Sequence, residues 1–257
     1  MSAHGHPVYF IGAGPGDPDL ITVKGRKLVE RADLVLYAGS LVPGEVVACA
    51  RKDARVVDSA PLDLEQTHAE LMTCVQNGGL AVRVHTGDPA LYGAIREQMA
   101  LLNRDGVAYE VVPGVTAGFA SAAAACRSYT VPEVTQTLIF TRLEGRTPVP
   151  EREQLAKLAA HGSAMCVYLS AGDPEGVQRE LLAGAYEPDT LVVAAYRVGW
   201  PDQQIRETVL ADLASTAREN NFTRQTVFLI LPGQGKSDAS SAKSLLYDTN
   251  FQHMFRK

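Results

Sequence analysis

The stretch Gly-Ala-Gly-Pro-Gly-Asp-Pro-Asp-Leu-Ile-Thr, residues 12–22, follows directly on the apolar run at residues 8–11. An apolar run that ends in closely spaced glycines predicts a buried strand, a tight loop and then a helix. A loop at the end of a buried strand is a common place for a ligand in α/β proteins. What this loop binds therefore decides most of what the sequence says about function.

The loop does not match the loops that bind nucleotide phosphates. A dinucleotide fingerprint needs G-x-G-x-x-G and an acidic residue at the end of the second strand. Here the glycines are spaced G-x-G-x-G, and the second strand carries its carboxylate, Asp33, at the wrong end. Asp17 and Asp19 put negative charge where a pyrophosphate needs donors. No Gly-Lys-Ser/Thr closes a Walker A loop. A nicotinamide-dependent oxidoreductase stays an alternative that the missing ribose carboxylate argues against.

The composition is that of an ordinary globular protein. Of the 257 residues, 46% are hydrophobic and 21% are charged, and the formal net charge is −5. Because there is no basic run, we expect no nucleic-acid partner. The apolar runs are short and no secretory signal precedes them, so we expect no membrane partner and a cytoplasmic location. The four cysteines lie far apart, and no metal-ligand spacing is present, so we expect reduced thiols and no metal.

Strands and helices alternate in the first half of the chain. We expect short buried strands over residues 7–12, 33–38, 54–58, 80–85 and 108–112, and helices near 22–31, 43–50, 63–77 and 92–104. The helical stretches place apolar residues three and four positions apart, as in Leu71 and Val75. Alternation of this kind predicts a largely parallel sheet.

The pattern changes after the small-residue stretch 116–125. Longer apolar segments follow at 135–142, 163–171, 190–199, 204–210 and 226–233. The turn-like link between 190–198 and 204–209 predicts an antiparallel pair. We therefore expect an α/β protein of two α/β domains, residues 1–114 and 115–236, followed by a tail over 237–257.

The triplet Gly-Asp-Pro occurs three times, at residues 16–18, 87–89 and 172–174. Glycine makes a turn, aspartate caps a helix and proline suits the first helical position, and this explanation suffices for 172–174. At 87–89 the triplet follows a buried strand, and polar residues crowd the same edge. We therefore expect a ligand site there, with Asp88 available to a cationic or hydroxyl-bearing group.

Three segments in order carry a family resemblance: YFIGAGPGDPDLITVKG (9–25), VRVHTGDPALYGA (82–94) and VVPGVTAGFASAAA (111–124). Together they resemble the tetrapyrrole (class III) S-adenosylmethionine-dependent methyltransferases, to about residue 233. The resemblance implies two α/β domains with the cofactor folded in the cleft between them. It implies that the glycine-rich loop lines the trough for the tetrapyrrole. Because the cofactor is a sulfonium cation without phosphate, the acidic residues of the loop are no longer out of place.

Within that family, YAGSLV (37–42), HTGDPALYGA (85–94) and TRLEGRTPVP (141–150) resemble the precorrin-4 C11-methyltransferases of cobalamin biosynthesis. The implied reaction moves a methyl group from S-adenosylmethionine to C11 of precorrin-4, giving precorrin-5 and S-adenosylhomocysteine. Another tetrapyrrole methylase, acting on cobalt-precorrin-4 or uroporphyrinogen III, stays an alternative. A binding module without catalysis is a third possibility. Diphthine synthases and ribosomal-RNA methylases match less well over 141–150.

The resemblance also implies site residues. Cofactor contacts fall on Pro15, Thr86, Gly87, Asp88, Leu91, Thr116, Ala117, Leu169, Gly199 and Thr226. Leu91 and Leu169 have the alternative of being core residues, and Thr116 with Ala117 that of a plain helix start. For the polycarboxylate substrate we expect the loop glycines Gly12, Gly14 and Gly16. We also expect the arginines at predicted strand ends or in adjoining loops, which are Arg83, Arg142, Arg146 and Arg197. Surface ion pairs are the alternative for the arginines.

The chemistry implied by this cofactor needs little from side chains. An electron-rich ring carbon displaces a neutral thioether in line, so no acid is needed to expel the leaving group, and alignment in a dry site supplies much of the rate. We expect no catalytic triad and assign no catalytic residue. If a base removes a proton from the methylated ring, the polar candidates are Tyr37, Ser40, His85 and Tyr92. Homodimers are usual in this family, and we expect one here.

Overall fold

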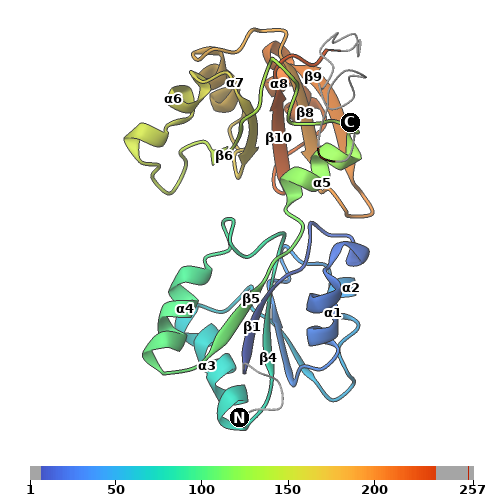
Figure 1. The fold of residues 1–257 in the computed structure, drawn as a ribbon, viewed down its shortest axis with the longest axis vertical. Coiled ribbons are helices and arrows are strands. Elements are labelled where there is room, and N and C mark those ends of the chain that lie inside the picture. The colour runs from blue at the N-terminus through green and yellow to red at the C-terminus, as the bar shows by residue number, and fades with distance from the viewer. Residues whose placement is uncertain (1–6, 236–253, 255–257) are drawn as a thin grey trace. The chain divides into compact units, whose positions relative to one another are not determined.

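The computed structural model describes residues 7–235 and residue 254. These residues form two compact units: one runs to residue 120 and includes 197–202, and the other comprises 121–196 and the residues from 203 onward. Each unit contains a five-stranded sheet (Figure 1). The expected tail over 237–257 lies outside the described residues except for Met254.

The sheet of the first unit is entirely parallel. Its strands are β1 (Val8–Gly12), β2 (Leu34–Tyr37), β3 (Arg55–Asp58), β4 (Ala81–His85) and β5 (Tyr109–Val112), in the spatial order β3-β2-β4-β1-β5. The expectation of a parallel sheet is therefore confirmed. The carboxyl ends of all these strands lie at one edge, where open α/β sheets bind ligands.

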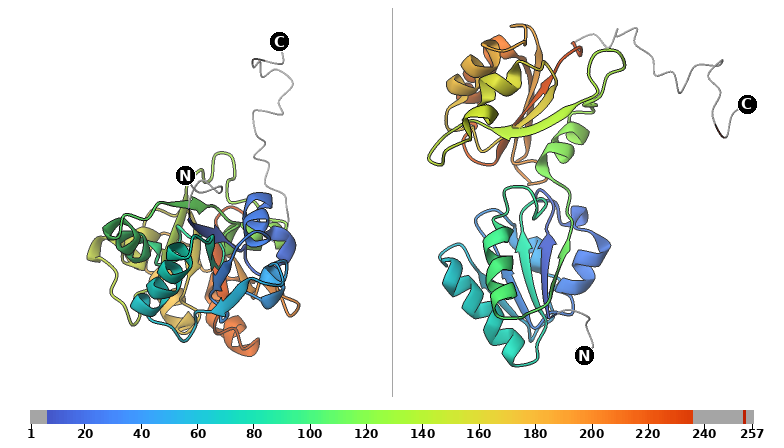
Figure 2. Two further views of the ribbon diagram at one scale, coloured as in Figure 1. Left: turned by 90° about the horizontal axis from the view of Figure 1, so that it is seen from below. Right: turned by 60° about the vertical axis from the view of Figure 1, so that its left-hand side comes forward.

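Helices cover both faces of this sheet, because side chains alternate between faces along each strand. They are α1 (Val23–Val29), α2 (Gly44–Val47), α3 (Leu64–Gln76) and α4 (Ile95–Arg104), with a short 3₁₀ turn η1 (Pro18–Leu20) after the glycine-rich loop. Tyr9 and Ile11 pack in the core on the α1 and α2 side. Val8 and Phe10 pack in the core with α3 and α4. Figure 2 shows the two helical layers on either side of the strands.

The sheet of the second unit is mixed. Its strands are β6 (Leu138–Arg142), β7 (Ala164–Tyr168), β8 (Leu191–Tyr196), β9 (Gln204–Val209) and β10 (Thr226–Leu231), in the order β6-β7-β10-β8-β9. Only β6 and β7 are parallel neighbours. The expected antiparallel pair is confirmed as β8 with β9, in which Tyr196 faces Gln204.

Three helices pack on one face of this second sheet. They are α6 (Leu155–Ala159), α7 (Pro174–Leu182) and α8 (Leu213–Glu219), while α5 (Ala117–Ala124) carries the chain from one unit to the other. The 3₁₀ turns η2 (Glu151–Glu153) and η3 (Leu210–Asp212) precede α6 and α8. Their apolar side chains share one core with alternate residues of the strands, such as Phe228 and Ile230.

The predicted helix start at residues 172–174 is confirmed. Asp173 caps α7, its Oδ1 accepting from the backbone N–H of Gly176 at 2.9 Å, and Pro174 occupies the first helical position. A side-chain acceptor there satisfies an amide that the helix leaves without a partner. This triplet needs no ligand to explain it.

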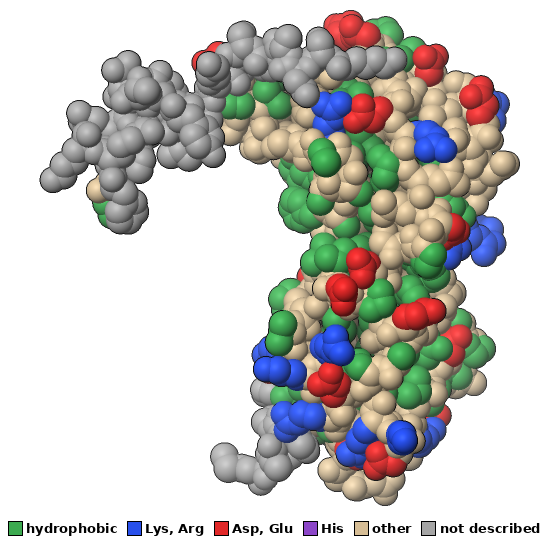
Figure 3. Space-filling view, turned by 90° about the vertical axis from the view of Figure 1, so that its right-hand side faces the viewer, with side chains coloured by type: hydrophobic (Ala, Val, Ile, Leu, Met, Phe, Trp, Pro, Cys, Tyr) green, Lys and Arg blue, Asp and Glu red, His purple; other side chains and the backbone are tan. Residues whose placement is uncertain are grey.

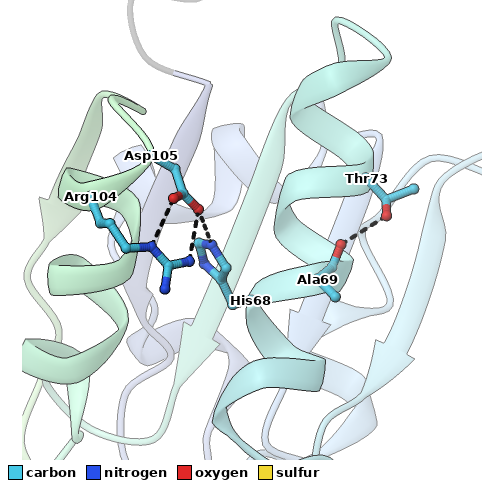
Figure 4. A network of polar contacts seen from close by, with 5 residues as sticks. All are labelled: His68, Ala69, Thr73, Arg104 and Asp105. Atoms are coloured by element: carbon cyan, nitrogen blue, oxygen red, sulfur yellow. Dashed lines mark hydrogen bonds and ion pairs between the residues drawn. The ribbon is translucent and has the colours of Figure 1, made fainter.

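A polar cluster ties α3 to the end of α4 (Figure 4). His68 of α3 contacts Asp105 through Nε2 and Oδ2 at 2.6 Å, and Arg104 donates to both oxygens of the same carboxylate, at 2.9 and 3.2 Å. The hydrogen bond from Arg104, followed by that from His68, lowers the pKa of Asp105 to about 2. The ionised carboxylate is therefore the form that holds the two helices.

We expect Asp105→Asn to lower the free energy of unfolding at neutral pH. Because the folded pKa lies below the ordinary value of 3.8, the carboxylate stabilises the fold above that value and loses this effect as pH falls towards about 2. As the pH falls from 3.8 towards about 2, the free energy of unfolding should therefore decrease less in the variant than in the native chain. Urea unfolding at several pH values measures this. Asp189→Asn, at an exposed position, is the control; parallel pH curves for the native chain and Asp105→Asn would contradict the assignment.

Candidate functional site

Three loops meet at the carboxyl edge of the first sheet: the glycine-rich loop after β1, the loop after β4 and the loop after β5. We call the place where they meet the loop interlock. Gly14 and Gly87 pair backbone to backbone, at 3.2 Å for the N–H of Gly14 and 2.7 Å for the N–H of Gly87. The N–H of Ala13 also donates to the carbonyl of His85 at 2.7 Å. The glycine-rich loop after β1 is thus attached to the loop after β4, where the Gly-Asp-Pro triplet lies.

Glycine is required where these loops meet. A Cβ on Gly12 would lie 2.5 Å from Cα of Gly114, and a Cβ on Gly114 would lie 2.1 Å from the carbonyl oxygen of Gly87. No side chain fits at such distances without moving backbone. The loop after β5 therefore completes the interlock.

Asp88 fastens the same loops. Its Oδ1 accepts from the N–H of Ala90 at 2.8 Å, and its Oδ2 accepts from the N–H of Gly114 at 2.9 Å. We expected this carboxylate to be available to a ligand, but each of its oxygens already holds a backbone amide. Contact with a cofactor stays a prediction, and the structure adds a role that the sequence did not reveal.

The expected cofactor residues of the first unit gather around this interlock. Pro15 and Gly87 are buried, Thr86 and Leu91 are half-buried, and Thr116 and Ala117 lie at the start of α5. Gly199 is also near, since a Cβ on it would lie 2.8 Å from the backbone nitrogen of Asp17. The helix-start explanation for Ala117 holds as well, because α5 begins there.

Two expected cofactor residues belong to the second unit. Leu169 follows β7 with a φ of 54° and is 71% exposed, so the alternative that it is a core residue is wrong. A bulky residue in the left-handed backbone region is strained, and an exposed side chain gains no packing energy that would offset this strain. Such residues are typical of functional sites. Thr226 begins β10 and is buried, its hydroxyl donating to the carbonyl of Arg224 at 3.4 Å.

We expected Arg83 at a strand end or in an adjoining loop. The structure places it in the middle of β4 instead. It is 8% exposed and donates to the Oε1 of Gln98 and to the carbonyl of Leu36, both at 3.3 Å. Burial lowers its pKa to about 10, against the opposing effect of Asp58. Its guanidinium is thus part of the interior of the first unit.

Two of the other arginines are engaged by their own loops. Arg142, at the end of β6, donates to the carbonyls of Thr147 at 3.1 Å and Pro148 at 2.7 Å. Arg197 pairs with Asp202 at 2.9 Å. Arg146 is exposed and, within the described part of the chain, has no hydrogen bond or ion pair. It is the arginine of this set with an unengaged guanidinium.

The candidate bases differ sharply in access. His85 is 4% exposed, and burial, followed by the nearby Arg83, lowers its pKa to about 3. It is therefore neutral near pH 7, and its buried Nε2 meets no partner among the described residues. Tyr37 at the end of β2 is half-buried and Ser40 is exposed. Tyr92 is 45% exposed with a φ of 57°. Access favours the latter three over His85.

Basic and acidic side chains are interspersed on the face shown in Figure 3. Among the described residues, no cluster of metal-ligating side chains occurs, and no helix has the length and apolarity to cross a membrane.

The structure also identifies a residue that the sequence analysis did not name, Trp200, whose Nε1 donates to the carbonyl of Pro15 at 3.1 Å. Its one sequence signal is that it is the only tryptophan.

Comparison with known proteins identifies the class. The profile of the Tetrapyrrole (Corrin/Porphyrin) Methylases matches residues 7–214. The chain therefore belongs to the tetrapyrrole methylase family and is by membership a methyltransferase. This confirms the resemblance carried by the three ordered segments, and the α/β fold class.

Particular relatives narrow the comparison. A cobalt-precorrin-4 C(11)-methyltransferase of Priestia megaterium is 48% identical, over 97% of each chain. A precorrin-4 C(11)-methyltransferase of Pseudomonas aeruginosa is 45% identical, over 97% of this chain and 98% of that protein. The X-ray structure of a cobalt precorrin-4 methyltransferase, 48% identical, superposes with a TM-score of 0.85 over 87% of this chain and 94% of that one. The structure of a uroporphyrin-III C-methyltransferase from Thermus thermophilus, complexed with S-adenyl homocysteine, is 25% identical in sequence. It superposes with a TM-score of 0.72 over 88% of this chain and 97% of that one.

Proposed function

We propose that this chain is a precorrin-4 C11-methyltransferase that transfers the methyl group of S-adenosylmethionine to C11 of the macrocycle, giving precorrin-5 in cobalamin biosynthesis. The observation that carries the proposal is the near full-length identity of 48% and 45% to relatives named for this reaction. Those relatives include both cobalt-precorrin-4 and precorrin-4 enzymes. The substrate class is thus a precorrin-4 ring, with or without cobalt.

The residues at the loop interlock suit S-adenosylmethionine better than a nucleotide phosphate. Asp17 and Asp19 follow the last glycine of the loop, and the carboxylate of Asp88 lies within the interlock. Negative charge there favours a sulfonium cation and disfavours a pyrophosphate. When bound, this cofactor supplies an activated methyl group. The proposed contacts are Pro15, Thr86, Gly87, Asp88, Leu91, Thr116, Ala117, Leu169, Gly199 and Thr226.

The protein's own contribution is binding and alignment. The interlocked backbone around Gly12, Gly87 and Gly114 gives a rigid surface, and rigid placement of two reactants removes much of the entropy cost of their encounter. Leu169, which is 71% exposed here, is proposed to exclude water from the reacting centres once the cofactor is bound. If a base accepts a proton after methylation, Tyr37, Ser40 and Tyr92 are the candidates with access, and His85 is too deeply buried.

The cofactor assignment is tested by calorimetry with S-adenosylhomocysteine and with NADH. We expect binding of S-adenosylhomocysteine and none of NADH. Trp200 gives a second signal, because it is the only tryptophan and contacts Pro15. Tight NADH binding without S-adenosylhomocysteine binding would instead support an oxidoreductase. Binding of S-adenosylhomocysteine without any methyl transfer to a precorrin would support a binding module.

Arg146→Ala is expected to raise the KM for the tetrapyrrole and to leave the affinity for S-adenosylhomocysteine unchanged. Its unengaged guanidinium is suited to a substrate carboxylate, and such a charge-assisted contact corresponds to about a tenfold to hundredfold change. Arg152→Ala is the control, since Arg152 is an exposed arginine that pairs with its neighbour Glu153 at 3.5 Å. A KM within about twofold of the native value would show that Arg146 does not bind the substrate. The backbone of the glycine-rich loop at Gly12, Gly14 and Gly16 would then be the proposed anchor, although the N–H of Gly14 already donates to the carbonyl of Gly87 at 3.2 Å.

The assembly and location follow from the same proposal. We propose a homodimer in the cytoplasm, as is usual for enzymes of this family. Light scattering of the purified chain measures the mass in solution, and a monomer at working concentration would contradict the dimer.

A further inference from the structure

The turn between β8 and β9 is built into the first unit. Residues 197–202 belong to that unit, although β8 and β9 belong to the other. The indole of Trp200 lies against the glycine-rich loop: a Cβ on Gly16 would be 2.4 Å from its Cδ1, and its Nε1 donates to the carbonyl of Pro15 at 3.1 Å. A distant segment therefore contacts the loop by both packing and a hydrogen bond.

The same turn holds the indole in place. The guanidinium of Arg197 stacks over the Trp200 ring at 4.2 Å from its centroid, and Nε of Arg197 pairs with Asp202 at 2.9 Å. The N–H of Trp200 donates to the carbonyl of Arg197 at 3.0 Å. Arg197 adopts a φ of 46°, a conformation that costs energy in a residue with a side chain. A strained arginine, a stacked indole and an ion pair within six residues make a preassembled support.

Gly199 lets this support approach the loop closely. It has a φ of 82°, and a Cβ there would lie 2.8 Å from the nitrogen of Asp17 and 3.3 Å from that of Gly16. The turn thus touches three consecutive residues of the loop, from Pro15 to Asp17. A glycine-rich loop without such contacts has many backbone conformations, because glycine is the least restricted residue.

We propose that Trp200, held by Arg197 and Asp202, is a positioning residue that fixes the glycine-rich loop in the conformation that receives the tetrapyrrole. The inference rests on the proposed function for the identity of that substrate. Arg197 then acts as part of this support, and not as a direct partner of the substrate carboxylates. Trp200 acts through Pro15 and Gly16 and does not touch the reacting atoms.

Trp200→Phe tests the proposal, because it keeps an aromatic ring and removes the N–H donor. We expect the KM for precorrin-4 to rise about two- to tenfold, as for the loss of one hydrogen bond, with kcat and the unfolding midpoint nearly unchanged. Arg197→Lys, which keeps the charge and loses the planar stack, should raise KM in the same direction. Val56→Ala, at a half-exposed site on β3, is the control and should leave KM unchanged.

Hydrogen exchange over residues 13–17 tests the loop without turnover. We expect faster exchange there in Trp200→Phe than in the native chain or in Val56→Ala, with the rest of the first unit unchanged. If the native chain does not methylate precorrin-4, the proposed function fails, while the exchange result still decides whether Trp200 orders the loop. Native exchange and native KM in Trp200→Phe, with an active native enzyme, would overturn the positioning role.

Discussion

Gly114→Ala is expected to abolish measurable binding of S-adenosylhomocysteine and to lower the unfolding midpoint. The new methyl group would lie 2.1 Å from the carbonyl oxygen of Gly87 and 2.7 Å from Cα of Gly12. Both neighbours are backbone, so the overlap is relieved only by separating the loops. Overpacking of this kind costs about 1–3 kcal/mol of stability, and here it also breaks the surface to which the ligand binds.

Gly44→Ala is the matched control for this substitution. Gly44 begins α2, and a Cβ there meets no atom within 4 Å. Since alanine is the better helix former, the control should be as stable as the native chain or slightly more stable. Calorimetric titration and thermal unfolding of both variants measure the difference. A Gly114→Ala protein with native affinity would mean that the interlocked loops do not form the binding surface.

Asp88→Ala is expected to weaken binding of S-adenosylhomocysteine at least about tenfold, while Asp173→Ala leaves it unchanged. Both residues stand in a Gly-Asp-Pro triplet, but the Asp88 carboxylate joins the N–H groups of Ala90 and Gly114, whereas that of Asp173 caps α7. Loss of the Asp88 carboxylate leaves the part-buried N–H of Gly114 without its partner and frees the loops that form the proposed binding surface. Removing a helix cap costs about 1 kcal/mol of stability and no binding.

Titration calorimetry and urea unfolding of the two variants separate these effects. The pair is its own control, because the same substitution is made in the same triplet. Asp88→Asn refines the test, since the amide keeps one acceptor oxygen and should recover part of the affinity. Equal affinities in the two alanine variants would show that Asp88 is no more than a local cap.

The first sheet could be predicted from sequence because its buried parallel strands are short apolar runs with clear ends. The expected strands at 7–12 and 80–85 differ by one residue from β1 and β4. The helix expected near 92 begins only at Ile95, because Tyr92 and Ala94 have φ values of 57° and 48° that no helix accepts. Local strain of this kind is set by tertiary contacts, and residue types alone do not reveal it.

The site residues named from the sequence stay predictions, and the sequence did not reveal which groups they contact. Arg83, Arg142 and Arg146 look alike in the sequence, as cations next to apolar segments. In the structure the first is buried in β4, the second binds the carbonyls of its own loop and only the third is unengaged. Trp200 was missed because a single aromatic residue in a turn has no periodicity, and its contact with Pro15 joins residues 185 apart in sequence.

The position of the transferred methyl group tests the central claim most directly. The native chain is incubated with S-adenosylmethionine carrying a ¹³C-labelled methyl group and with precorrin-4, and in parallel with cobalt-precorrin-4, and the product is examined by NMR. We expect the label on C11 of at least one of the two rings, with S-adenosylhomocysteine formed in equal amount. Label on another ring carbon, or no transfer to either ring by a protein that binds S-adenosylhomocysteine, would contradict the account.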